Sequence, residues 1–174
     1  MDKKAARSLY DAIVAQARQQ ELYTHCNVPD TLDGRFEMIV LHLHDVLVRL
    51  SNCREAEEDF NRRLLETFFE DMEISLREMG IGDISVPKKI KKMVQAAYGR
   101  FNAYTDADKP DGVSLQKILC RNVFSDHDAI QEPARHLAVY AGNVQKHLRD
   151  LEDKLILAGN LRYPGMSILC GEVI

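Results

Sequence analysis

Histidine and glutamate side chains at helical spacing are the first residues in this sequence that could do chemistry, because both can bind metal ions. Two-metal sites in helical bundles use Glu-x-x-His pairs, since residues three apart on a helix converge on one metal pair. The chain contains no such motif. His42 and His44 are two residues apart and point to different sides of a helix, while Glu132 and His136 are four apart beside a proline, without a second motif. The sequence therefore predicts no metal and no cofactor.

His42 belongs to a polar series on an otherwise apolar helix. His42, Asp45 and Arg49 follow one another at three- and four-residue steps, so they share a helix face. We expect them to be hydrogen-bonded within the bundle or to face a groove. A helical enzyme or a haem carrier with His42 or His136 as ligand is an alternative of lower rank.

Nucleophiles with their bases are equally scarce. The chain has no GxSxG, GxxxxGK[ST], GxGxxG or DDxxD motif. Cys26 follows His25, but adjacent side chains rarely point together, so the pair is a weak signal for catalysis. The four cysteines are scattered without a CxxC motif, which predicts reduced thiols. We expect a protein that is not an enzyme.

Opposite charge on two consecutive helices is the clearest electrostatic feature. Residues 55–78 carry nine acidic and three basic side chains, whereas residues 87–104 carry five basic and no acidic ones. The two helices could complement each other, or the second could dock on phosphates of ribosomal RNA or on anionic lipid. The residues of that docking face would be Lys88, Lys89, Lys91, Lys92, Tyr98, Arg100 and Tyr104. The net charge of -4 argues against a general nucleic-acid binder, and we expect no DNA partner.

Helical periodicity organises the whole chain of 174 residues. Glycine and proline cluster between periodic segments, and no strand pattern stands out. The prediction is an all-α fold, one domain over residues 1–174 built as a bundle of about six helices. The expected helices cover residues 3–20, 32–50, 56–79, 87–104, 114–124 and 126–158, with Asp126 capping the last. The helix at 32–50 has the widest apolar face and is expected to be central.

The two ends of the chain carry weaker signals. Residues 161–174 form an apolar tail that should pack back on the body. The longest uncharged apolar stretch, residues 136–145, is about half of a membrane-spanning length, so we expect no transmembrane helix. The first residues resemble neither a secretory signal nor a transit peptide.

Three ordered strings between Tyr23 and Tyr104 carry a family resemblance. They are Tyr23 with residues 28–38, 41–42 and 49–50; residues 68–83; and residues 86–93 with 98–100 and 103–104. Together they resemble the ubiquinol-cytochrome c chaperone family. The part from Lys109 onward matches only loosely.

The resemblance implies an assembly chaperone for the ubiquinol-cytochrome c reductase. Family members engage newly made cytochrome b near the ribosomal exit, together with a small accessory assembly protein. Because the chain begins directly with the family domain, we expect an alphaproteobacterial member in the cytoplasm, with peripheral contact to the inner face of the inner membrane, or on the matrix side if the source is eukaryotic. The alternative is an RNA-, ribosome- or anionic-membrane-binding factor acting through residues 87–104.

The residues of the resembling strings have structural or recognition roles. Asp30 to Gly34 should form a tight turn into a helix, Gly80 and Gly82 a backbone reversal, and Asp83 a cap for the next segment. Charged residues among apolar ones suggest a paired network between helices or a recognition surface: Arg35, Asp71, Arg77 and Glu78. Phe36 and His42 also lie in these strings, and we expect a structural or recognition role for them as well.

Overall fold

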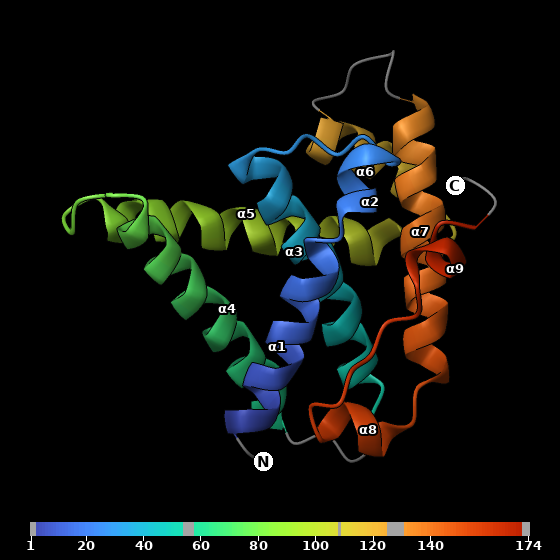
Figure 1. Ribbon diagram of the computed structural model, residues 1–174, viewed down its shortest axis with the longest axis horizontal. Helices are drawn as coiled ribbons and strands as arrows, with labels where there is room; N and C mark the ends of the chain where they lie inside the picture. Colours follow the sequence, from blue (N-terminus) through green and yellow to red (C-terminus); the bar gives the residue numbers. More distant parts are fainter. Residues whose placement is uncertain (1–2, 54–57, 108, 125–130, 172–174) are drawn as a thin grey trace.

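The computed structural model describes residues 3–53, 58–107, 109–124 and 131–171, and within these ranges the protein is helical without a strand (Figure 1). The helices are α1 (Lys3–Ala17), α2 (Gln20–Thr24), α3 (Leu32–Ser51), α4 (Glu58–Glu78), α5 (Val86–Ala107), α6 (Leu115–Phe124), α7 (Gln131–Asp150), α8 (Asp153–Leu157) and α9 (Met166–Leu169). Six of these described helices have ten or more residues, which confirms the all-α bundle of about six helices.

Helix α3 lies at the centre of the bundle, as its wide apolar face predicted. Thirteen of its 20 residues are buried, and it packs against α1, α4, α5, α6 and α7. Its start is fixed locally, because the Thr31 hydroxyl accepts a hydrogen bond of 3.1 Å from the Gly34 N–H. Each long helix of the bundle is therefore positioned relative to α3.

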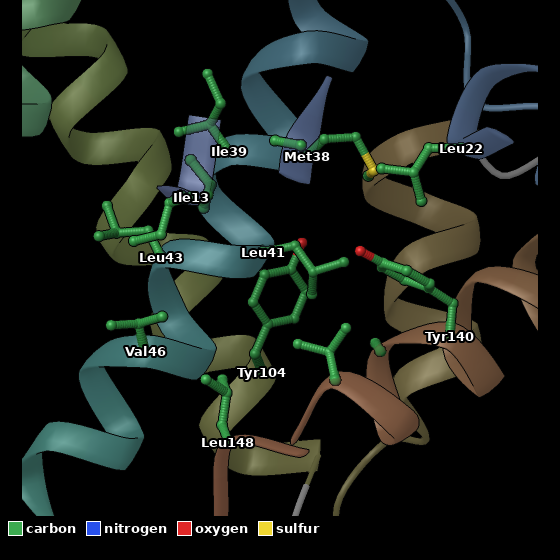
Figure 2. Close-up of a cluster of buried hydrophobic side chains, with 14 of the residues drawn as sticks. Ile13, Leu22, Met38, Ile39, Leu41, Leu43, Val46, Tyr104, Tyr140 and Leu148 are labelled. Atoms are coloured by element: carbon green, nitrogen blue, oxygen red, sulfur yellow. The ribbon is translucent and has the colours of Figure 1, made fainter. Parts of the chain in front are cut away.

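Buried side chains of α3, α5 and α7 form the middle of the core. Figure 2 shows Tyr104 of α5 and Tyr140 of α7 pointing into the interior beside Met38 and Leu41 of α3. Tyr104 is only 2% exposed. The expectation that Tyr104 belongs to a docking face is therefore wrong, because its ring is part of the core.

The predicted helix over residues 126–158 is two helices in the structure. Asp126 lies outside the described residues, and α7 begins at Gln131 with Pro133 in its first turn, where a missing N–H costs little. After Asp150 the backbone becomes extended at Glu152, and α8 follows. At this break, Arg49 of α3 donates hydrogen bonds to the carbonyls of Leu148 and Leu151, and it thereby satisfies carbonyls that the end of α7 leaves free.

The end segments also differ from the expected pattern in detail. The expected helix over residues 3–20 ends at Ala17 in the structure, and the short α2 follows over Gln20–Thr24. In the tail, Leu161, Met166 and Leu169 are buried, and Figure 1 shows α9 beside α7. The predicted packing of the tail on the body is therefore confirmed for the described residues up to 171.

Helices α4 and α5 meet at a sharp reversal that forms the left edge of the molecule in Figure 1. Gly80 has φ +78°, and its N–H and that of Ile81 close the end of α4 on Arg77 and Leu76 carbonyls. Gly80 thus has its predicted role. Asp83 instead accepts a hydrogen bond from Arg77, three residues before α5 begins, so it is not the cap of that helix.

Candidate partner-binding groove

A groove of about 750 Å³ lies between the start of α3, the end of α4, and the faces of α5 and α6. Exposed Pro29 and Leu32 lie at its margin, and buried or half-buried apolar side chains from all four helices line it: Phe36 of α3, Leu76 of α4, Met93 and Ala96 of α5, and Val123 of α6. Lys89 and Lys92 also line it and are exposed, so their ammonium groups lie at its solvent edge. The groove combines an apolar interior with two cationic side chains.

The loop before α3 forms one wall of the groove through close backbone packing. A Cβ atom added to Gly34 would lie 2.0 Å from the Pro29 carbonyl oxygen, so only glycine fits this approach. Asp30 and Arg35 add an exposed ion pair of 2.7 Å across the same turn. The predicted tight turn at residues 30–34 therefore has a clear structural reason, and it shapes the groove.

A charge pair closes the inner end of the groove. Arg100 of α5 donates hydrogen bonds of 2.8 to 3.1 Å to both carboxylate oxygens of Glu37 in α3. Burial raises the pKa of Glu37, and Arg100 partly offsets that rise. Because the guanidinium is committed to Glu37, Arg100 is not available as a free phosphate ligand, contrary to its place in the expected docking face.

The four lysines at the start of α5 are exposed, and no ion pair within the described residues involves them. Three acidic residues of α4 pair instead with arginines of the same helix, Asp59 and Glu66 with Arg62, and Glu73 with Arg77. Where α4 and α5 meet, Tyr98 packs near Phe69 at 6.4 Å between ring centroids. In the described part of the chain, the two oppositely charged helices do not neutralise each other through direct ion pairs.

The remaining charged motif residues form separate pairs instead of one network. The Tyr10 hydroxyl of α1 donates a hydrogen bond of 2.9 Å to Asp71 of α4, and burial together with Asp71 raises the pKa of Tyr10. Arg77 bridges Glu73 and Asp83 at the surface, and Glu78 is exposed. Of Arg35, Asp71, Arg77 and Glu78, only Asp71 is bonded to a residue of another helix in the part of the chain that the structure describes. These residues therefore do not form the expected network between helices.

The polar series of α3 is hydrogen-bonded inside the bundle. His42 donates from Nδ1 to the Met38 carbonyl at 2.7 Å, so its Nε2 accepts from the Tyr140 hydroxyl at 2.6 Å. Burial lowers the pKa of His42. Asp45 accepts from Gln145 at 3.0 Å, and Arg49 pairs with Asp153. The expected hydrogen bonding is confirmed, and both ring nitrogens of His42 are already engaged.

Of the residues considered for metal binding and catalysis, Glu132 and His136 lie 3.3 Å apart, and Arg135 pairs with the same Glu132 carboxylate. His44 contacts Thr105 of α5 at 3.1 Å, on the opposite side from His42, as their spacing predicted. Within the ranges described, no three His, Cys, Asp or Glu side chains gather as metal ligands. The Cys26 thiol contacts Cys170 while His25 contacts Thr24, and burial raises the pKa of Cys26 to about 12. Cys26 is therefore not activated by its neighbour.

Several groove residues could not be singled out from the sequence. Leu76, Met93 and Glu37 stand inside the resembling strings but look like ordinary amphipathic helix positions. Asn122 and Val123 of α6 lie in the part that matched only loosely. What these residues share is their place in the fold, since three strings that are separate in the sequence converge on one groove.

The fold is that of an all-α bundle, and the groove between its helices combines apolar side chains with a cationic edge. A family profile described as "Ubiquinol-cytochrome C chaperone" matches residues 24–163, so the chain belongs to this family of complex III assembly chaperones. Among the described residues, no helix combines the length and the apolar character needed to cross a membrane.

Individual relatives agree with this assignment. The chain is similar to a solved structure entitled "Crystal structure of the Cbp3 homolog from Brucella abortus", with 36% identity, a TM-score of 0.81, and coverage of 94% of this chain and 91% of that one. It is 26% identical to ubiquinol-cytochrome-c reductase complex assembly factor 1 of Xenopus laevis, over 91% of this chain and 80% of the relative. The Mus musculus counterpart is also 26% identical over 92% of this chain, which spans only 55% of its length.

Proposed function

We propose that this protein is a non-enzymatic assembly chaperone for the ubiquinol-cytochrome c reductase, and that it binds newly made cytochrome b through the groove between α3 and α5. One observation carries the proposal. The three strings that resemble the family supply Gly34 and Phe36, then Leu76, then Lys89 and Met93 to the same groove. Family members named as assembly factors of this complex support the same role.

The groove suits part of a membrane-protein client. Its volume of about 750 Å³ holds a few side chains of a larger chain. Apolar side chains of the client would contact Phe36, Met93 and Val123, and an acidic side chain would meet Lys89 or Lys92 at the edge. Such a contact shields apolar surface of the client until its partner subunits bind.

Site-specific crosslinking in the source organism tests this proposal. Met93 would be replaced by a photo-reactive phenylalanine analogue, with the same replacement at exposed Ile168 of α9 as the control. After brief irradiation and solubilisation in mild detergent, cytochrome b should be crosslinked from position 93 and not from position 168. Cytochrome b recovery no greater than that of unrelated abundant membrane proteins would contradict the proposal.

A groove-filling substitution makes the test independent of crosslinking chemistry. Ala96→Phe adds a ring to the groove lining, whereas Gln95→Phe adds the same ring to an exposed neighbouring position outside the lining. We expect Ala96→Phe alone to reduce co-purification of tagged protein with cytochrome b, with both variants equally folded by circular dichroism. Equal co-purification would show that the groove is not the client site.

Ribosomal RNA binding is a second candidate function, favoured by the four exposed lysines without an ion pair in the described chain. Replacing Lys88, Lys89, Lys91 and Lys92 by Ala should then reduce the salt dependence of ribosome binding by a slope of roughly 0.7–0.9 for each lost phosphate contact. An unchanged slope would remove this candidate. A small accessory assembly protein is a further proposed partner, and the proposed location is the cytoplasmic or matrix side of the inner membrane.

A further inference from the structure

The reversal between α4 and α5 exposes large apolar side chains. Ile84 is 97% exposed, and Met79 and Ile74 at the end of α4 are about half exposed at 48% and 52%. We call residues 79–85 the α4–α5 tip. Figure 1 shows this tip at the left edge of the molecule, on the opposite side of the bundle from α7 and α9. An isoleucine exposed to this extent leaves apolar surface in contact with water, and binding to a partner surface would bury it.

Cationic side chains stand directly behind the tip on a face of α5 that does not line the groove. Lys89 and Lys92 line the groove, but Lys88 and Lys91 do not, and three-residue spacing places Lys88 and Lys91 on one helix face. Lys91 is five residues after the start of α5 at Val86, so its Cα lies only about 7.5 Å along the axis from that start.

The acidic groups near the tip do not cancel this positive charge. Between positions 73 and 92 the chain has five basic residues and three acidic ones. Arg77 holds two of the acidic ones, Glu73 and Asp83. Exposed Glu78 is the third, while all four lysines stay without an ion pair in the described residues.

From this arrangement we infer that the α4–α5 tip docks on an anionic lipid surface. Ile84 and Met79 enter the boundary between headgroups and acyl chains, which interfacial segments penetrate by about 5–10 Å. At that depth Lys88 and Lys91 reach the level of anionic headgroups, which attract lysine side chains. The contact uses different residues from the cytochrome b groove, so it does not rest on the proposed client.

A single tryptophan reports on this docking, because the chain contains none. The full-length Ile84→Trp variant is mixed with vesicles of phosphatidylcholine containing phosphatidylglycerol, and Ile168→Trp, at the 68% exposed position on α9, is the control. We expect a blue shift of the emission and quenching by brominated acyl chains for position 84 only. Absence of both signals at position 84 overturns the inference, as does an equal response at position 168.

Charge reversal tests the role of the lysines. Adding Lys88→Glu and Lys91→Glu to the Ile84→Trp variant should weaken partitioning into anionic vesicles by about tenfold or more. Lys146→Glu with Lys154→Glu, at exposed positions of α7 and α8, is the matched control and should change partitioning far less. Equal partitioning of both double variants, or equal binding of the parent to pure phosphatidylcholine, overturns the electrostatic docking.

The client and membrane contacts can fail separately. Crosslinking of cytochrome b from position 93 is measured in detergent with the Lys88→Glu and Lys91→Glu variant. Retained crosslinking with lost vesicle binding supports two distinct contacts. If the same charge reversal leaves vesicle binding intact and abolishes the crosslink, the basic face serves the client instead of lipid, and the inference is overturned.

Discussion

The α3–α7 interface and the α4–α5 arm, which we define as residues 73–92 around the α4–α5 tip, hold charged side chains in different environments. Arg49 lies in the interface, is 9% exposed, and donates to two carbonyls and one carboxylate. Lys88 and Lys91 in the arm are exposed and have no ion pair in the described chain. Because a buried charge must be satisfied inside the protein, the interface serves stability, whereas the charge of the arm stays exposed to solvent. This comparison predicts large stability effects in one region and small ones in the other.

The largest effect is expected for Arg49→Met. This substitution removes the Arg49 donor from the Leu148 and Leu151 carbonyls and from Asp153, which keeps a hydrogen bond from Cys53. Removing one partner from such a buried, charged set costs about 3 kcal/mol of unfolding free energy. Urea denaturation measures it, with Arg149→Met at an exposed α7 position as the control, for which we expect less than about 0.5 kcal/mol. Similar losses of unfolding free energy for both variants would contradict the special role of the buried Arg49 in stability.

Gly34→Ala should have the next largest effect. The added Cβ would overlap the Pro29 carbonyl oxygen at 2.0 Å, so the loop at the groove must move, at a cost of about 2 kcal/mol. Gly142→Ala in α7 is the matched control, since its Cβ would meet nothing within 4 Å and alanine favours a helix. Thermal denaturation of the two variants should therefore shift in opposite directions. A stabilised Gly34→Ala variant would show that the loop is not tightly packed.

A smaller, pH-dependent effect is expected from His42. Burial lowers the pKa of His42 below its ordinary value of 6.5, so the unfolded chain takes up a proton in acid before the folded protein does. Stability should therefore fall as the pH drops below about 6.5, by at most about 1.4 kcal/mol per pH unit from this group. Denaturation between pH 5 and pH 7 should show a shallower loss for His42→Asn than for Tyr140→Phe, which keeps the imidazole. Identical slopes would assign the acid sensitivity to other groups.

The same contrast explains which structural features were predictable from sequence. Helices α3, α4 and α5 have continuous apolar periodicity and clear ends, so their predicted bounds differ from the structure by at most three residues at either end. The break between α7 and α8 has no glycine or proline to mark it, and Arg49, which binds the carbonyls there, is about 100 residues earlier in the chain. Local sequence patterns predict helices, but they carry no information about hydrogen bonds between segments that are distant in the sequence.

The candidate site was predictable only in part, for a related reason. Lys89, Lys92, Gly34 and Phe36 stood in the resembling strings, and the structure brings them to one groove. Tyr104 was placed on the wrong surface, although Ala97, Phe101 and Tyr104 follow the spacing of a buried helix face. An apolar residue in a basic string can therefore belong to the core, and helix phase is the better guide to which residues face a partner.

The smallest effect is expected for Arg77→Ala in the arm. Arg77 bridges Glu73 and Asp83, but its side chain is 47% exposed and that of Asp83 is 84% exposed. Solvent-exposed ion pairs contribute little to stability, so the variant should unfold at nearly the same urea concentration as the parent, and the difference should shrink in high salt, which screens the pairs in the parent. Urea denaturation at low and high ionic strength measures this, with Arg49→Met under the same conditions for scale. A loss for Arg77→Ala as large as that for Arg49→Met would mean that the α4–α5 arm depends on surface charge for its stability. The distinction between the two regions would then fail.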